Sequence, residues 1–223
     1  MKVILFGASG MVGQGVLRAA LLAPDVEQVL LVGRTSIDLR HAKLRQLAQP
    51  DLFDYSTASA QLQGYDACFF CLGVSAAGLD EAQYTRLTYE LTLAAAQPLA
   101  QRNPGMTMVY VSGAGTDSSE RGRSMWARVK GRTENALLRL PFKAVYLFRP
   151  SAIQPLHGAR SKTTSYRVFY TLAAPLMPLL RRLWPRAILS TESMGDAMLN
   201  AARRGGPGGV LESADIYALA GGR

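Results

Sequence analysis

The sequence predicts an α/β protein with a doubly wound parallel sheet, and three observations support this prediction. Short apolar runs alternate with helical patterns along the 223 residues, as expected of strand–helix–strand units. The runs are rich in Val, Ile, Leu, Phe and Tyr, which is typical of strands buried on both faces. The first run leads directly into a glycine-rich turn. Hydrophobic residues make up 48% of the chain, enough for a full buried core.

The individual elements follow from these patterns. We expect strands over the apolar runs, at residues 3–6, 29–32, 67–71, 106–111 and 144–148. The spacing of these runs adds a strand near 47–51, and a short last strand at 210–211 follows a glycine-rich turn. Helical patterns lie between the strands at 12–22, 80–101 and 125–140, and a late helix begins near Thr191 behind a Ser or Thr cap.

Composition narrows the class of protein. Lys and Arg number 25 against 16 Asp and Glu, a net charge of +9, which suits partners that carry phosphate groups. Two cysteines are too few for a disulfide scaffold. No uncharged apolar stretch reaches the roughly 18 residues of a membrane-spanning helix, and the chain opens on a strand rather than a signal peptide. We expect one cytoplasmic domain over 1–223, with a small substrate-side cap at 151–190.

The glycine-rich turn after the first strand has the spacing G-x-x-G-x-x-G. Its first glycine permits a tight turn, its second lets the backbone approach a pyrophosphate, and its third lets the helix pack closely on the strand. Amides at the helix N-terminus then face the phosphates. The sequence therefore predicts a dinucleotide site formed by Gly7, Ser9, Gly10, Met11, Val12 and Gly13.

Arg34 at the end of the second strand indicates which dinucleotide is bound. NAD sites usually place Asp or Glu here for the ribose 2′-hydroxyl, whereas NADP sites offer Arg to the 2′-phosphate. Arg34 is followed by Thr35 and Ser36, with no acidic residue beside it. Because an Arg fork binds phosphate through two charge-assisted hydrogen bonds, we expect NADP rather than NAD.

Four later motifs, in this order, carry a family resemblance: CLGVS at 71–75, YVSGAG at 110–115, VKG at 129–131 and FRP at 148–150. Together with the glycine loop they resemble the short-chain dehydrogenase/reductase superfamily over nearly the whole chain. The resemblance is greatest to its atypical, epimerase/dehydratase-like members, the Tat-interacting-protein-like oxidoreductases. It implies a Rossmann-type sheet with a small C-terminal cap. It also places Asp51 and Leu52 by the adenine, Leu72 and Gly73 by the adjoining ribose and phosphates, and Pro150 and Ile153 by the nicotinamide.

The same resemblance assigns catalytic roles, with one departure. Ser112 matches the serine that orients a substrate carbonyl, and Lys130 matches the lysine that holds the nicotinamide ribose. Four residues before Lys130 stands Trp126 instead of the proton-donating tyrosine. Indole has only an N–H donor and cannot act as a general acid–base at ordinary pH. We expect another proton source, such as water or the cap residues Tyr166 and Tyr170; His157 is more simply a polar loop residue.

Three functions remain open from the sequence. The first is an NADP-dependent oxidoreductase that acts on a small carbonyl compound. The second is a non-catalytic NADP(H)-binding redox sensor or protein-interaction module, which the loss of the tyrosine favours. The third is a nucleotide-sugar epimerase or dehydratase, which we rank last because it needs that tyrosine and a larger substrate domain.

Other features point to packing more than to chemistry. Cys68 and Cys71 would face opposite sides of a strand, so we interpret them as core thiols, and with only His41 and His157 we expect no metal site. No serine has the G-x-S-x-G pattern of a hydrolase. Arginines flank an apolar stretch within 160–186, which we interpret as a cap helix, with peripheral membrane contact as the second interpretation. Nucleic-acid binding lacks a supporting motif.

Overall fold

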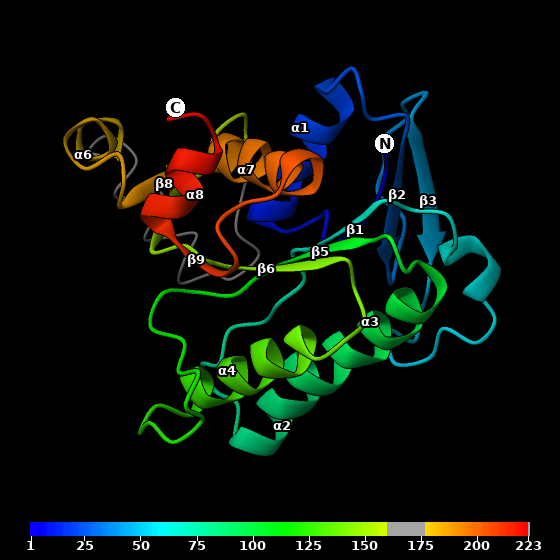
Figure 1. The fold of residues 1–223 in the computed structure, drawn as a ribbon, viewed down its shortest axis with the longest axis horizontal. Coiled ribbons are helices and arrows are strands. Elements are labelled where there is room, and N and C mark those ends of the chain that lie inside the picture. Colours follow the sequence, from blue (N-terminus) through cyan, green and yellow to red (C-terminus); the bar gives the residue numbers. More distant parts are fainter. Residues whose placement is uncertain (160–176, 223) are drawn as a thin grey trace.

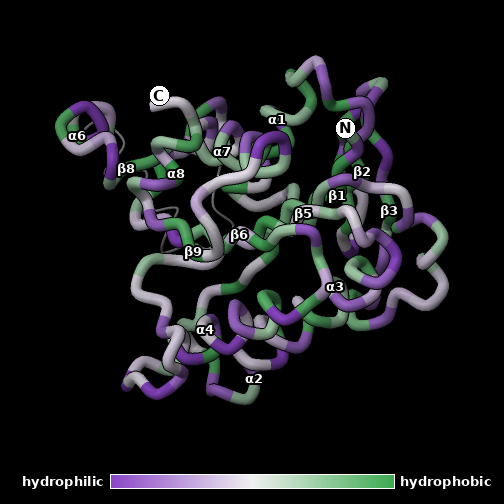
Figure 2. Tube along the Cα trace, in the orientation of Figure 1, coloured by the Kyte–Doolittle hydropathy of each residue, from purple (hydrophilic) through white to green (hydrophobic). Residues whose placement is uncertain are grey.

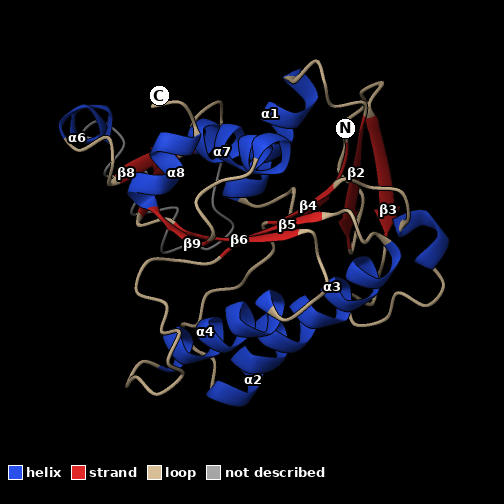
Figure 3. Cartoon of the chain, in the orientation of Figure 1, coloured by secondary structure: helices blue, strands red, loops and turns tan. Residues whose placement is uncertain are grey.

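The computed structural model describes residues 1–159 and 177–222. Its centre is a seven-stranded sheet in which every adjacent pair of strands is parallel. The strands lie in the order β3 (Leu44–Ala48), β2 (Gln28–Gly33), β1 (Lys2–Phe6), β4 (Ala67–Phe70), β5 (Thr107–Val111), β6 (Ala144–Arg149) and β9 (Gly209–Glu212). β2 and β3 lie on one side of β1, and β4, β5, β6 and β9 lie on the other. Helices cover both faces of the sheet (Figure 3). The predicted Rossmann-type α/β fold is confirmed.

Helices form a layer on each face of the sheet (Figure 1). One layer contains α1 (Met11–Leu22), α7 (Thr191–Arg204) and α8 (Ser213–Leu219). The other contains α2 (Glu81–Thr85), α3 (Leu91–Arg102) and α4 (Met125–Leu138), and a short 3₁₀ turn, η1 (Ser59–Leu62), precedes β4. None of the helices in the described ranges combines the length and hydropathy needed to span a membrane.

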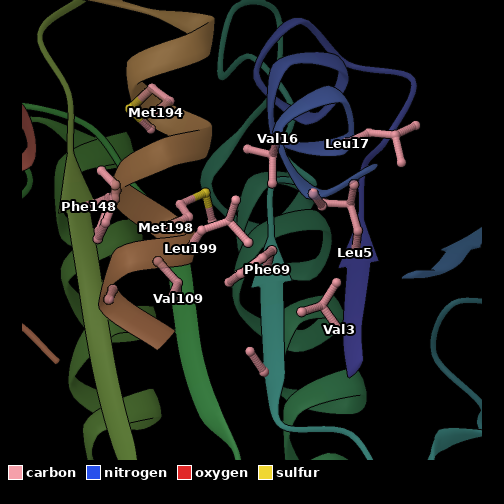
Figure 4. Close-up of a cluster of buried hydrophobic side chains, with 14 of the residues drawn as sticks. Val3, Leu5, Val16, Leu17, Phe69, Val109, Phe148, Met194, Met198 and Leu199 are labelled. Carbon is pink, nitrogen blue, oxygen red and sulfur yellow. The ribbon is translucent and has the colours of Figure 1, made fainter. Parts of the chain in front are cut away.

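The alternation of side chains along each strand divides the core into two layers. Val3 and Leu5 of β1 pack toward α1 and α7, whereas Ile4 and Phe6 pack toward the opposite helices. Figure 4 shows the first layer, which Val16 and Met198 close from the helices. This double burial explains why the strands are continuous apolar runs in the sequence.

Two glycines bring α1 and α7 into close contact. A Cβ atom on Gly15 would lie 2.3 Å from the carbonyl oxygen of Thr191, and one on Gly195 would lie 2.6 Å from the Cβ of Ala19. The helices can pack at this distance only because both positions lack a side chain. The contact fixes α1, whose N-terminus faces the candidate site.

Two elements differ from the expected ones. The helix expected over 80–101 consists of α2, a π-helical segment η2 (Arg86–Glu90) and α3. The strand expected near 47–51 is β3 at Leu44–Ala48. β3 lies at the sheet edge and is only partly buried, so its sequence carries polar residues and little of the apolar signal.

The C-terminal region contributes a second, two-stranded parallel sheet. It pairs β7 (Ala152–Gln154) with β8 (Ile188–Ser190), and α6 (Met177–Leu183) precedes β8. Tyr166, Tyr170 and most of the stretch 160–186 lie outside the described residues. The cap at 151–190 therefore stays a prediction.

Candidate active site

A groove of about 1010 Å³ runs along the carboxyl edge of the large sheet. Its walls come from the segments that directly follow β1, β2, β4, β5 and β6, and from α4. β2 and β4 lie on opposite sides of β1, so the strand order reverses there and this edge contains a topological switch point. Open α/β sheets bind ligands at such points.

The glycine loop shapes the middle of the groove. Gly7 has a φ of +79°, a left-handed conformation that favours glycine. The N–H of Gly10 donates to the carbonyl of Gly7 at 2.9 Å, which closes the turn. A Cβ atom on Gly13 would lie 2.1 Å from that same carbonyl oxygen, so Gly13 acts by letting α1 approach and does not itself line the groove.

The N-terminus of α1 is suited to an anion. Its N-cap Gly10 forms no side-chain capping bond, and its first turn contains no acidic residue. Ser9, Gly10, Met11 and Val12 line the groove beside it. The first N–H groups of a helix have no intrahelical partner, so they and the helix dipole are available to a phosphate.

Arg34 lines the part of the groove that follows β2. Its side chain is exposed and makes no hydrogen bond or ion pair with any residue that the structure describes. Thr35 and Ser36 line the groove next to it, and Leu52 contributes an apolar wall. Asp51 is not among the lining residues, because its carboxylate turns back to accept the N–H of Phe53 at 2.8 Å.

At the other end the structure brings together Ser112, Trp126 and Lys130, with Pro150 and Ile153 nearby on the wall. Leu72 and Gly73 line the same groove on the β4 side. Trp126 and Lys130 are one turn apart on α4, as their spacing predicts. Gly131 lets α4 pack closely against the loop that contains Asp117, because a Cβ atom at this position would lie 1.8 Å from the carbonyl oxygen of Asp117.

The hydroxyl of Ser112 already has a partner. Ser112 Oγ lies 3.0 Å from Thr116 Oγ1, and the Thr116 hydroxyl donates to the carbonyl of Gly113 at 2.8 Å. Because the Thr116 proton is used in that bond, Ser112 donates its own proton to Thr116. Ser112 must therefore rotate its O–H to donate to a substrate carbonyl.

Lys130 is a titratable group in a buried environment at this end of the groove. Burial lowers the pKa of Lys130 to about 8, although the charge of Glu134 acts in the opposite direction. The Lys130 ammonium lies 5.7 Å from the centroid of the Tyr110 ring. Glu134 is itself bound by Arg149, whose Nε donates to its carboxylate at 3.1 Å. A lysine in this state can lose or take up a proton near neutral pH.

Sequence reasoning missed Tyr84. This side chain is 2% exposed and forms part of the groove wall from α2. Burial, and then the charge of Tyr84, raise the pKa of Tyr110, so the two phenols are close. The capping residue Asp80 predicts the helix that carries Tyr84, but no sequence pattern shows which face of this helix meets the groove.

The two cysteines and His157 have other surroundings, although Cys71 also lines the groove. Cys68 belongs to the core layer on the α3 side, whereas Cys71 Sγ lies 4.0 Å from Met198 Sδ on the α7 side. Burial raises the pKa of both thiols, so neither is a ready nucleophile. His157 lines a separate cavity of about 340 Å³ between α1 and α7, at 3.8 Å from Glu192, and not the groove.

Comparison with known sequences gives distant relatives. No family model matches the chain. The chain is similar to "Protein FMP52, mitochondrial" of Candida albicans, with 23% identity over 212 residues that cover 92% of this chain and 89% of that protein. It is 29% identical to the Saccharomyces cerevisiae protein of the same name, over 73% of this chain and 69% of that one.

These relatives correct the expected cytoplasmic location. The FMP52 proteins of both yeasts, and that of Emericella nidulans, are named as mitochondrial. The expectation was wrong because composition and an opening strand are compatible with several compartments and carry no information that separates them.

Comparison with solved structures identifies the fold. The chain superposes on the Bordetella bronchiseptica enzyme WbmF in complex with NAD⁺ with a TM-score of 0.67 and 19% identity, over 99% of this chain and 76% of that one. Uronate dehydrogenase from Agrobacterium tumefaciens gives 0.67 and 14%, over 96% and 76%. UDP-glucuronic acid 4-epimerase from Bacillus cereus, in complex with NAD, gives 0.63 and 12%, over 95% and 76%. The chain thus has the fold of these dehydrogenase and epimerase structures.

Proposed function

We propose that this chain is an NADP-dependent oxidoreductase of the atypical short-chain dehydrogenase type that acts on a small carbonyl compound. One observation carries the proposal: a single groove is lined both by the glycine loop with Arg34 and by Ser112 with Lys130. The first pair is suited to a dinucleotide phosphate, and the second to a carbonyl oxygen.

The residues of the groove fit the cofactor in three places. Arg34, with the hydroxyls of Thr35 and Ser36, would hold the 2′-phosphate. The uncapped N-terminus of α1 would hold the pyrophosphate. Lys130 would hold the hydroxyls of the nicotinamide ribose. NADPH, when bound, supplies the hydride that reduces the carbonyl carbon of the substrate.

Lys130 also supplies the proton in this proposal, since Trp126 cannot. Ser112 would donate a hydrogen bond to the substrate carbonyl oxygen and so hold it in place. The Lys130 ammonium would deliver its proton to that oxygen as the carbon accepts the hydride, which gives an alcohol. Water would then reprotonate the neutral amine. The pKa of about 8 suits this role, because a general acid works best when its pKa is near the working pH.

Trp126 favours a second candidate, a redox sensor that binds NADP(H) without turnover. Its indole lines the groove where the family's proton donor would be. This candidate binds the cofactor at the same site but transfers no hydride to a substrate.

The test is NADPH oxidation with a panel of small aldehydes, ketones and quinones. We expect slow turnover by the wild-type chain and a rise of about 100-fold in Trp126→Tyr, the lower end of what a positioned general acid contributes. Trp184→Tyr is the matched control, because Trp184 is 57% exposed and does not line the groove. If all three proteins bind NADPH and none turns over any compound, the oxidoreductase proposal fails and the sensor is favoured.

A further inference from the structure

Two consecutive large hydrophobic side chains are exposed at the C-terminal end of α6. Leu183 is 59% exposed and Trp184 is 57% exposed. The other large hydrophobic residues exposed in the described part of the chain occur singly. A single exposed hydrophobic residue is ordinary on a protein surface, whereas adjacent ones mark an interaction surface more often.

The charged residues that neighbour this pair in the sequence are all positive. Arg181, Arg182 and Arg186 flank it, and residues 177–190 contain no Asp or Glu. No ion pair joins these arginines to an acidic residue within the described ranges. Their charge is therefore available to an anionic partner, and the +9 net charge of the chain acts in the same direction.

The fold displays the pair at the rim of the molecule. Figure 1 shows α6 at the periphery, beside β8 and away from the helices that carry the groove. Figure 2 shows hydrophobic and hydrophilic residues side by side on this helix. Met177 is buried at its start, and the N–H groups of Ala187 and Ile188 each donate to the carbonyl of Trp184 at 3.0 Å. Trp184 thus belongs to a turn that is hydrogen-bonded to Ile188, the first residue of β8.

We propose that residues 177–186, here called the α6 patch, dock on the surface of an anionic lipid bilayer. Trp184 and Leu183 would enter the interfacial region, where Trp is favoured because its ring is amphipathic. Arg181, Arg182 and Arg186 would meet the lipid phosphates. A short basic and aromatic helix end lies on such a surface without crossing it. This proposal is independent of the proposed oxidoreductase activity.

The first experiment follows the indole of Trp184. Trp126 and Trp184 are the two tryptophans of the chain, so full-length Trp126→Phe reports on Trp184 alone. We expect its emission to shift to shorter wavelength with vesicles of phosphatidylcholine and phosphatidylglycerol in equal parts, and not with vesicles of phosphatidylcholine alone. An equal shift with both vesicles, or no shift with either, overturns the proposal.

The second experiment measures vesicle binding by sedimentation. We expect the triple variant Arg181→Gln, Arg182→Gln, Arg186→Gln to bind anionic vesicles about 100-fold more weakly, at about fivefold per arginine. The matched control removes the same charge from exposed arginines elsewhere, Arg40→Gln, Arg121→Gln and Arg139→Gln. It should bind within about threefold of wild type, because distant charges are screened in physiological salt. If both triple variants bind anionic vesicles equally weakly, the α6 patch is not the docking site. Binding of the chain to RNA but not to vesicles also overturns the proposal.

Discussion

At the residue scale, the proposed proton transfer depends on two positions of α4. Trp126 stands where the resemblance to short-chain dehydrogenases places the proton-donating tyrosine, and Lys130 lies one turn later on the same helix. Burial lowers the pKa of Lys130 into the range where a lysine can act as a general acid. In our proposal the proton source therefore lies one helical turn from the position that the resemblance gives to tyrosine.

This assignment predicts a pH dependence. Only the ammonium form of Lys130 can donate, so the rate of carbonyl reduction should be constant below pH 8 and fall about tenfold per unit above it. Lys130→Arg keeps the charge but cannot deprotonate in this range. Its residual rate should therefore be low and flat between pH 6 and about 10. A wild-type profile as flat as that of Lys130→Arg would show that another group supplies the proton.

The sequence allowed part of this site to be predicted. The spacing of Trp126 and Lys130 predicted that both lie on one helix face, and the family resemblance predicted that Ser112 belongs to the same site. The sequence did not indicate Tyr84, because no sequence pattern shows which face of α2 meets the groove. Nor did it indicate that Thr116 accepts the hydroxyl of Ser112, because that contact is specific to one loop conformation.

At the element scale, the contact between α1 and α7 fixes the helix that faces the phosphates. Sequence propensity treats Gly15 as a weak point in α1, since glycine destabilises a helix interior by about 1 kcal/mol relative to alanine. The structure gives it the opposite role, because a Cβ atom there would lie 2.3 Å from the carbonyl oxygen of Thr191. The five buried strands were predictable from their apolar runs, whereas such helix–helix contacts were not.

Gly15→Ala tests this contact. We expect the free energy of unfolding to fall by about 1–3 kcal/mol, the usual cost of overpacking a tight interface. Urea denaturation measures it, with Gly105→Ala as control, because a Cβ atom on Gly105 has nothing within 4 Å. If Gly15→Ala were more stable than wild type, helix propensity would outweigh the contact and the two helices would not be closely packed.

At the scale of the whole molecule, parallel strands bring distant segments to one edge. Residues near positions 10, 34, 72, 112 and 150 meet in one groove because each follows a strand of the same direction. This convergence was predictable from the alternation of strands and helices. The shape of the C-terminal region was not, since β7 and β8 are three residues each and leave little pattern in the sequence.

The proposed function requires that the groove bind NADPH through Arg34, and calorimetric titration of the full-length chain measures this binding. We predict micromolar binding of NADPH and at least about tenfold weaker binding of NADH, a difference of about 1.4 kcal/mol. Arg34→Glu should abolish this preference, because a carboxylate repels the 2′-phosphate and accepts the ribose hydroxyl. Equal affinity for both cofactors, or a preference unchanged in Arg34→Glu, would contradict the role of Arg34. Binding of neither would contradict the function of the groove.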